Sequence, residues 1–466
     1  MPHPIASWSS LLAIAPWITA SEGASVYADV GLAWIAPFAI LLLGIAILPL
    51  AAPHFWEHNR NKLIFALLCG LPAAVYMWKY AGDHSIALTL HDHPILSALH
   101  EYVAFILLLF ALFAISGGIY VKGTLAGTPT VNTAILAVGA AVASFVGTTG
   151  ASMLLIRPLL RANAVRKRKA HVVIFFIFVV SNCGGLLTPL GDPPLFLGFL
   201  HGVPFTWTFG LWKQWLLVNG ALLVVFQFLD SWFFHREDVE EKRTDLDEAV
   251  EKARQPLGIE GGFNLFLLLG IVATIYCSGQ FEWPTGAQEG AMLALALVSI
   301  ATTSKEVRTR NQFSYAPIVE VACLFLGIFL AMVPALKILN CRGAELGVAS
   351  ARSFYWASGT LSSFLDNAPT YLTFASVAAG LEHLAAEGRY LAEYLQMGPH
   401  AVKVLAAISC GSVMMGANTY IGNGPNFMVK AIAESAGVKM PSFFGYMGWS
   451  IAVLIPIFVV VTFTFF

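Results

Sequence analysis

The strings TPLGDPP at residues 188–194 and TYIGNGP at residues 419–425 each interrupt a long apolar segment. Alignment of the surrounding sequence gives a set of matched pairs: Ser181 with Ser412, Thr188 with Thr419, Gly191 with Gly422, Asp192 with Asn423 and Pro194 with Pro425. Glycine and proline break helices, so each string predicts a helix that is interrupted rather than continuous. The same break at two places predicts that the chain contains a repeated unit.

The composition indicates that these breaks lie inside a membrane. Hydrophobic residues make up 58% of the 466 residues and charged residues only 11%, whereas soluble domains average about 25% charged residues. So few charges do not cover a surface of this size in water, and the predicted partner is the lipid bilayer. The net charge of -1 also argues against nucleic-acid binding, which requires a basic face.

Apolar segments of membrane-spanning length occur along the whole chain. They lie near residues 32–51, 62–80, 100–121, 131–160, 171–200, 214–234, 262–279, 289–303, 316–336, 353–380, 401–433 and 446–466. The segments at 131–160 and 353–380 are too long for one crossing and contain Gly-Thr-Thr-Gly and Asp-Asn-Ala-Pro, so each is predicted to be a re-entrant hairpin. The segments at 171–200 and 401–433 are predicted to be helices broken within the membrane.

Lysine and arginine predict the orientation, because they concentrate in cytoplasmic loops. Residues 161–169 and 235–260 hold five each, whereas residues 1–31, 81–99 and 280–288 hold none. The charged linker at 235–260 is therefore expected in the cytoplasm, as a solvated helix, with the protein in a bacterial-type inner (plasma) membrane. The N-terminal segment 1–31 is open to three interpretations: a cleaved signal peptide, an extra helix or an interfacial segment.

The predicted fold class is an all-α polytopic membrane protein with two inverted repeats, at residues 32–234 and 261–466, joined by the linker at 235–260. Each repeat is expected to contain three spans, a re-entrant hairpin, a broken helix and a final span. Because this makes an odd number of crossings, the second repeat is upside down relative to the first. Inverted repeats are common in secondary transporters, where discontinuous helices hold the substrate near the membrane midplane.

Interrupted helices suit ion binding, because freed carbonyls attract cations and half-helix N-termini attract anions. The candidate ion- and substrate-binding residues at the breaks are Thr148, Thr149, Ser181, Asn182, Thr188, Asp192, Ser363, Asp366, Asn367, Thr370, Asn418, Thr419, Asn423 and Asn426. Oxygen ligands of this kind suit a hard cation such as sodium. The alternative for each of these side chains is that it only caps a broken helix.

Two of these residues, Asp192 and Asp366, are acidic. A charge at mid-membrane costs at least about 2.5 kcal/mol, so an intramembrane carboxylate indicates function. Because burial favours the protonated carboxyl, such a group can exchange a proton for a cation. The candidate sodium ligands are therefore Asp192, Asp366, Asn182 and Asn367. Glu320, in the span near 316–336, is a further intramembrane acid to which the sequence assigns no role.

The strings SNCGGLLTPLGDPP at 181–194 and SSFLDNAPT at 362–370 resemble those of NhaD-type sodium/proton antiporters in the ion transporter superfamily. That superfamily also includes arsenite pumps, citrate carriers and dicarboxylate/sodium symporters. The resemblance implies alternating access, with hairpins and broken helices moving as a unit against a scaffold that often forms a homodimer. It further implies that the ion site includes Asn182, Thr188, Asp192, Asp366 and Asn367.

The sequence departs from the antiporter pattern in three places. The first hairpin tip, at 145–150, has no acid where antiporters usually carry an Asp-Asn pair. Pro193 and Pro194 replace residues that usually bear hydroxyls. The second broken span, IGNGPNFMV at 421–429, is more similar to the carboxylate symporters.

The leading functional prediction is a cation-coupled sodium/proton antiporter that exchanges Na⁺ and H⁺ and needs no cofactor. The alternative is a sodium- or proton-coupled citrate or dicarboxylate carrier of the same superfamily, in the putative citrate transporter branch. No nucleophile or metal constellation of an enzyme is visible, and no nucleotide-binding loop indicates a pump driven by ATP. A channel would not need paired hairpins and broken helices.

Overall fold

The computed structural model describes residues 27–90, 92–241, 255–281 and 283–466. Within these ranges, nine helices are long and apolar enough to cross a membrane: Leu32–Pro49, Asn59–Asp83, Pro94–Ser116, Pro129–Val146, Phe205–Arg236, Phe263–Phe281, Ala316–Leu346, Pro399–Asn418 and Phe443–Phe465. Lipid offers no hydrogen-bond partners to backbone N–H and C=O groups, whereas a helix pairs these groups internally. The chain is therefore a polytopic integral membrane protein, as predicted.

The elements in the first part of the described chain occupy residues 32–241. They are η1 (Leu32–Ile35), α2 (Ala36–Ala51), α3 (Pro53–Trp56), α4 (Asn59–Asp83), α5 (Pro94–Ser116), β1 (Tyr120–Thr124), α6 (Pro129–Val146), α7 (Thr148–Ala162), α8 (Ala170–Val179), η2 (Cys183–Leu186), α9 (Pro193–Leu200), η3 (Phe205–Leu211) and α10 (Trp212–Glu241).

The elements in the second part occupy residues 255–465. They are β2 (Gln255–Glu260), α12 (Phe263–Phe281), α13 (Ala287–Thr302), α14 (Lys305–Arg310), α15 (Ala316–Arg342), η4 (Gly343–Leu346), α16 (Ala351–Ser362), α17 (Asn367–Leu381), α18 (Tyr390–Gln396), α19 (Pro399–Met415), η5 (Gly416–Asn418), α20 (Gly424–Ser435) and α21 (Phe443–Phe465).

The described part of the structure is all-helical as predicted, apart from two short strands that the sequence did not predict. β1 pairs with β2 in antiparallel register, with Tyr120 opposite Glu260 and Val121 opposite Ile259. The linker was predicted to be a helix; among its described residues, the first part, up to Glu241, continues α10, whereas the last part, from Gln255, is β2. Proline and glycine in QPLGIE disfavour a helix, and pairing with β1 satisfies the backbone instead. Residues 242–254 lie outside the described residues.

The helices end at the predicted breaks. α6 and α7 are joined by Gly147 alone, with a φ of 80°, which glycine adopts without steric cost. α16 and α17 are separated by residues 363–366, and both broken spans pass through a short 3₁₀ turn before the next helix begins. As a result, four short helices, namely α7, α9, α17 and α20, start within the body of the protein.

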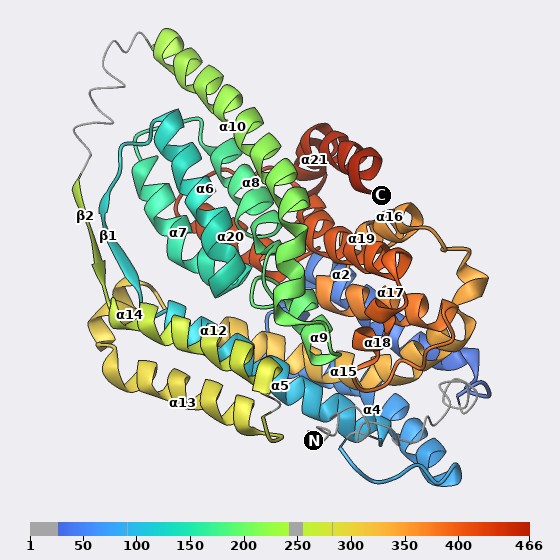
Figure 1. Cartoon of the computed structure of the whole chain (residues 1–466). Coiled ribbons are helices and arrows are strands. Elements are labelled where there is room, and N and C mark those ends of the chain that lie inside the picture. The colour runs from blue at the N-terminus through green and yellow to red at the C-terminus, as the bar shows by residue number, and fades with distance from the viewer. Residues whose placement is uncertain (1–26, 91, 242–254, 282) are drawn as a thin grey trace, which may run out of the picture.

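Figure 1 shows two groups of helices. α4, α5, α12, α13 and α15 run along one side, and α15 packs on α4, α5 and α17. The broken elements lie on the other side, where α7 packs on α20 and α9 packs on α17. Glu320, which had no assigned role, lies on α15 and pairs with Lys62 of α4 at 2.6 Å, so this intramembrane acid joins two helices of the first group.

A buried polar network fastens α6 to α8 and α10. Asp230 of α10 accepts hydrogen bonds from Arg166 Nη2 at 2.6 Å, from His171 Nε2 at 2.7 Å and from Asn132 Nδ2 at 2.9 Å. All four side chains are buried. One carboxylate therefore holds together the start of α6, the loop before α8, the start of α8 and the middle of α10.

We expect Asp230→Ala to destabilise the protein strongly, because it leaves the buried Arg166 without its charge partner. Removing one member of a buried pair costs about 3–5 kcal/mol. The measurement is the thermal unfolding midpoint in detergent. The control is Glu306→Ala, whose exposed pair with Arg310 is worth at most about 1 kcal/mol. Equal midpoints for the two variants would contradict the role of the network.

Candidate functional site

All four helix breaks meet at the carboxylate of Asp192, the N-cap residue of α9, which is 1% exposed. Its Oδ1 accepts a hydrogen bond from Thr148 Oγ1 at 2.8 Å, and its Oδ2 accepts one from Asn367 Nδ2 at 2.7 Å. Asn423 Nδ2 lies 3.3 Å from Oδ1. Thr148 begins α7, Asn367 begins α17 and Asn423 caps α20. The structure thus brings together one predicted residue from each break.

The partners of Asp192 are all neutral. In the part of the chain that the structure describes, no lysine, arginine or histidine forms an ion pair with this carboxylate. A buried charge is costly unless it is paired or neutralised. The arrangement is therefore suited to take up a cation or a proton.

A second group of amides ties the two broken spans to each other. Asn182 Nδ2 donates to Asn426 Oδ1 at 2.7 Å, and Asn182 Oδ1 accepts from Asn423 Nδ2 at 3.1 Å. Asn426 Nδ2 in turn donates to the carbonyl oxygens of Gly416 and Thr419, at 2.8 and 2.9 Å. These amides satisfy carbonyls that the helix break has freed, which is the capping role that the sequence left open for them.

The two broken spans are built in the same way. The hydroxyl of Thr188 donates to the carbonyl of Ser144, and the hydroxyl of Thr419 donates to that of Ser363. The N-cap residues Asp192 and Asn423 have similar backbone dihedral angles, with φ of -145° and -148° and ψ of 146° and 140°. Each threonine hydroxyl thus joins its broken span to a carbonyl at the end of the first helix of the preceding pair, which explains why threonine occurs at both positions.

Glycine is required at both breaks for a steric reason. A Cβ atom on Gly191 would collide with the carbonyl oxygen of Gly185, and one on Gly422 would collide with that of Gly416. The chain therefore folds back on itself at a distance that only glycine permits. This close approach sets the position of the N-cap residue that follows.

Asp366 has a different role from Asp192 in this structure. Its Oδ1 accepts from the backbone N–H of Ala368 at 3.0 Å, which makes it the N-cap of α17, and Thr370 Oγ1 donates to its carbonyl at 2.9 Å. The side chain is half-buried. Among the described hydrogen bonds, none joins this carboxylate to Asp192 or Asn182. The two acids that the sequence grouped together thus have different hydrogen-bond partners.

The remaining predicted residues lie around this centre. Ser181 Oγ and Ser152 Oγ are 2.8 Å apart, and Asn418 Nδ2 donates to Ser363 Oγ at 2.9 Å. Ser363 Oγ also donates to the carbonyl of Gly359 at 2.8 Å. These contacts join the broken spans to α7 and to the end of α16. They support the site but do not contact Asp192.

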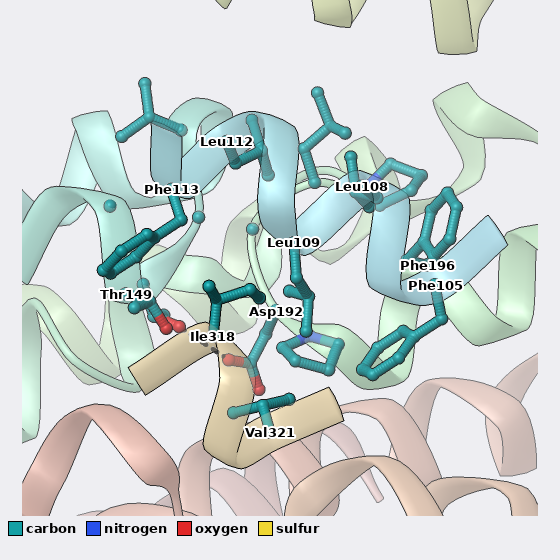
Figure 2. A pocket seen from close by; sticks show the side chains of 18 of the residues that line it. Phe105, Leu108, Leu109, Leu112, Phe113, Thr149, Asp192, Phe196, Ile318 and Val321 are labelled. Carbon is teal, nitrogen blue, oxygen red and sulfur yellow. Dashed lines mark hydrogen bonds between the residues drawn. The ribbon is translucent and has the colours of Figure 1, made fainter. Parts of the chain in front are cut away.

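A cavity of about 70 Å³ reaches Asp192 and Thr149 (Figure 2). Residues 146–150 and 189–193 and Phe196 form one part of its walls, and the mainly apolar remainder comes from α5 and α15. The lining side chains on these two helices include Phe105, Leu108, Leu109, Leu112, Phe113, Ile318 and Val321. Sequence reasoning missed them, because an apolar residue that lines a cavity has the same sequence signal as one that faces lipid.

A family model described as "Putative citrate transport" matches residues 27–466. The chain belongs to this family. No curated protein sequence matches the chain. Membership in the citrate-transport family confirms the prediction of a transporter rather than an enzyme, and it confirms the resemblance to the citrate branch of the ion transporter superfamily.

For this member of the family we expect Asp192→Asn and Asp366→Asn to differ. An amide at 192 has one acceptor oxygen for three donors and no charge, so a buried donor stays unpaired, at a cost of about 1–3 kcal/mol. Citrate uptake into proteoliposomes should fall by roughly 100-fold. Asparagine at 366 still caps α17, so uptake should fall by less than about tenfold.

The helical content of both variants, measured by circular dichroism, controls for misfolding. Equal loss of uptake in two correctly folded variants would contradict the distinction between a central carboxylate and a helix cap.

Proposed function

We propose that the protein is a secondary carrier that couples the movement of citrate, or a related carboxylate, to Na⁺ or H⁺. One observation carries this proposal. The carboxylate of Asp192 is buried at the junction of four helix breaks and is held by three neutral donors. Family membership supplies the substrate class, and the unpaired charge supplies the reason for a coupling cation.

The cation would bind among the oxygen atoms around Asp192. The hydroxyl of Thr148 can rotate to offer a lone pair, and Asn182 Oδ1 accepts from the Asn423 amide beside the carboxylate. Carboxylate, hydroxyl and amide oxygens are ligands that hard cations prefer. A proton on the carboxyl is the other way to neutralise the charge.

The carboxylate substrate would bind beside Thr149 at the start of α7. The backbone N–H groups of Thr149 and Gly150 belong to the first turn, where intrahelical acceptors are missing, and both residues line the cavity. A helix N-terminus favours an anion. Asp192 lies on the same cavity, so its charge repels an anion until a cation neutralises it. Coupling follows because the cation must bind before the substrate.

The transport architecture is also a proposal: two inverted repeats, each with a re-entrant hairpin. Its support is that helix contacts recur in pairs. The contact between α4 and α15 has its counterpart in the contact between α13 and α5. The contact between α17 and α9 has its counterpart in the contact between α7 and α20. In this arrangement the hairpins and broken helices move as one unit against α4, α5, α13 and α15. By resemblance, a homodimer is formed through the scaffold.

A second candidate is sodium/proton antiport without a carboxylate. The observation that favours it is the buried carboxyl of Asp192, which has no cationic partner among the described residues, since one group can bind Na⁺ and H⁺ in turn. The tip of the first hairpin, Gly147, offers no second acid. Antiport would then depend on Asp192 alone.

Proteoliposomes containing a pH-sensitive dye distinguish the two functions. We expect uptake of labelled citrate or succinate only in the presence of a sodium or proton gradient, and no dye response to sodium alone. A dye response to sodium alone that Asp192→Asn abolishes would instead establish antiport. Absence of both signals in correctly folded protein would refute both functions.

We expect Thr149→Val to raise the apparent KM for citrate by about tenfold or more, because a hydrogen bond to a charged group is worth about 1.5–3 kcal/mol. The measurement is the concentration dependence of citrate uptake at saturating cation. The control is Thr464→Val, since the hydroxyl of Thr464 on α21 only donates to the carbonyl of Val460. An unchanged KM would remove the hydroxyl of Thr149 from the substrate site.

A further inference from the structure

Two ion pairs cross between the two helix groups, away from the Asp192 site. His201 Nε2, at the end of α9, lies 3.5 Å from Glu101 Oε2 on α5. Lys337 Nζ, on α15, lies 2.5 Å from Glu387 Oε1 in the loop after α17. In each pair one partner belongs to a scaffold helix and the other follows a short helix that starts at a break.

The two pairs border a second cavity of about 60 Å³, whose lining includes all four of their residues together with Asp92 and Met332. His201 and Lys337 are 8% and 9% exposed. Polar and charged groups this deeply buried are stable only when they have partners. Separating either pair therefore needs water or another partner to enter the cavity.

Backbone contacts strengthen the same junction. His201 Nδ1 lies 3.2 Å from the carbonyl of Gly388, and the N–H of Leu391 donates to the carbonyl of His201 at 3.1 Å. Lys337 Nζ donates to the carbonyl of Ala386 at 3.4 Å and stands 4.4 Å from the ring centroid of Tyr27. The loop after α17 and the end of α9 are thus bound to each other and, through the ion pairs, to the scaffold.

The two cavities lie at different levels of the molecule. Val321, on the first cavity, and Lys337, on the second, are sixteen residues apart on α15, which is about 24 Å along a helix. α9 connects the levels, because Asp192 caps its first turn and His201 follows its last residue. A displacement of Asp192 against α5 and α15 therefore also displaces His201 from Glu101.

We propose that Glu101–His201 and Lys337–Glu387 form a latch that closes the passage on this side, and that both pairs must separate before the Asp192 site is reached from there. The charge distribution along the sequence places this side outside the cell. The proposal rests on the proposed transport function, because it assumes that α9 and α17 move against α5 and α15. The pair of Lys62 and Glu320, within the scaffold, is not part of the latch.

Cross-linking tests the latch. In a chain whose six native cysteines are replaced by serine, the latch variants are E101C/H201C and K337C/E387C, and the matched control is K62C/E320C. A short bifunctional thiol reagent should stop citrate uptake in both latch variants and leave the control variant active. Uptake that continues after complete cross-linking of both latch pairs would overturn the proposal.

A second measurement does not depend on transport. We place a single cysteine at Met332, which is 3% exposed and lines the second cavity, and label it with a membrane-impermeant thiol reagent. Adding Glu101→Gln and Glu387→Gln should raise the labelling rate at least about tenfold, whereas adding Glu320→Gln should not change it. An unchanged rate in the latch variant would overturn the latch, even if the chain transports neither citrate nor sodium. A raised rate without any transport would retain the latch and refute the proposed function.

Discussion

The structure depends on one unfavourable feature: the carboxylate of Asp192, which lies at the centre of a membrane protein without a cationic partner in the described residues. A charge in a medium of low polarity is stabilised only by oriented dipoles or by a bound ion. Thr148, Asn367 and Asn423 supply the dipoles, and each comes from a different helix break. The four breaks must meet for any of them to reach Asp192. The charge that carries the proposed function therefore also explains why the helices are interrupted.

Interrupting a helix also leaves backbone carbonyls without hydrogen-bond donors. The same types of side chain supply the donors at both broken spans. Freed carbonyls need donors, since lipid offers none. Thr188 and Thr419 supply hydroxyl donors at equivalent positions, and Asn426 supplies an amide. Gly191 and Gly422 permit the close backbone approach that these bonds require. Because both broken spans use one solution, the same residue types recur in the sequence.

The short length of α9 links the two ends of this helix in the proposed carrier. α9 runs only from Pro193 to Leu200, so the carboxylate before it and the ion-paired His201 after it move together. In the proposed carrier, binding at one end of α9 is therefore linked to closure at the other end. A continuous membrane helix would separate the two functions by its full length.

The sequence by itself determined the membrane environment, the positions of the helix breaks and the presence of a carboxylate, Asp192, at one of them. These properties depend on local composition: apolar runs, glycine and proline punctuation, and a carboxylate where carboxylates are costly. It also predicted which residue types would line the breaks, although Asp366 could not be separated from Asp192, because a helix cap and an ion ligand have the same sequence signal. Only the tertiary structure decided that Asn367 reaches Asp192 from 175 positions away, that β2 replaces the end of the predicted linker helix, and that α5 and α15 wall the cavity. Those outcomes depend on contacts between distant segments, and such contacts are fixed by packing rather than by the residues on either side.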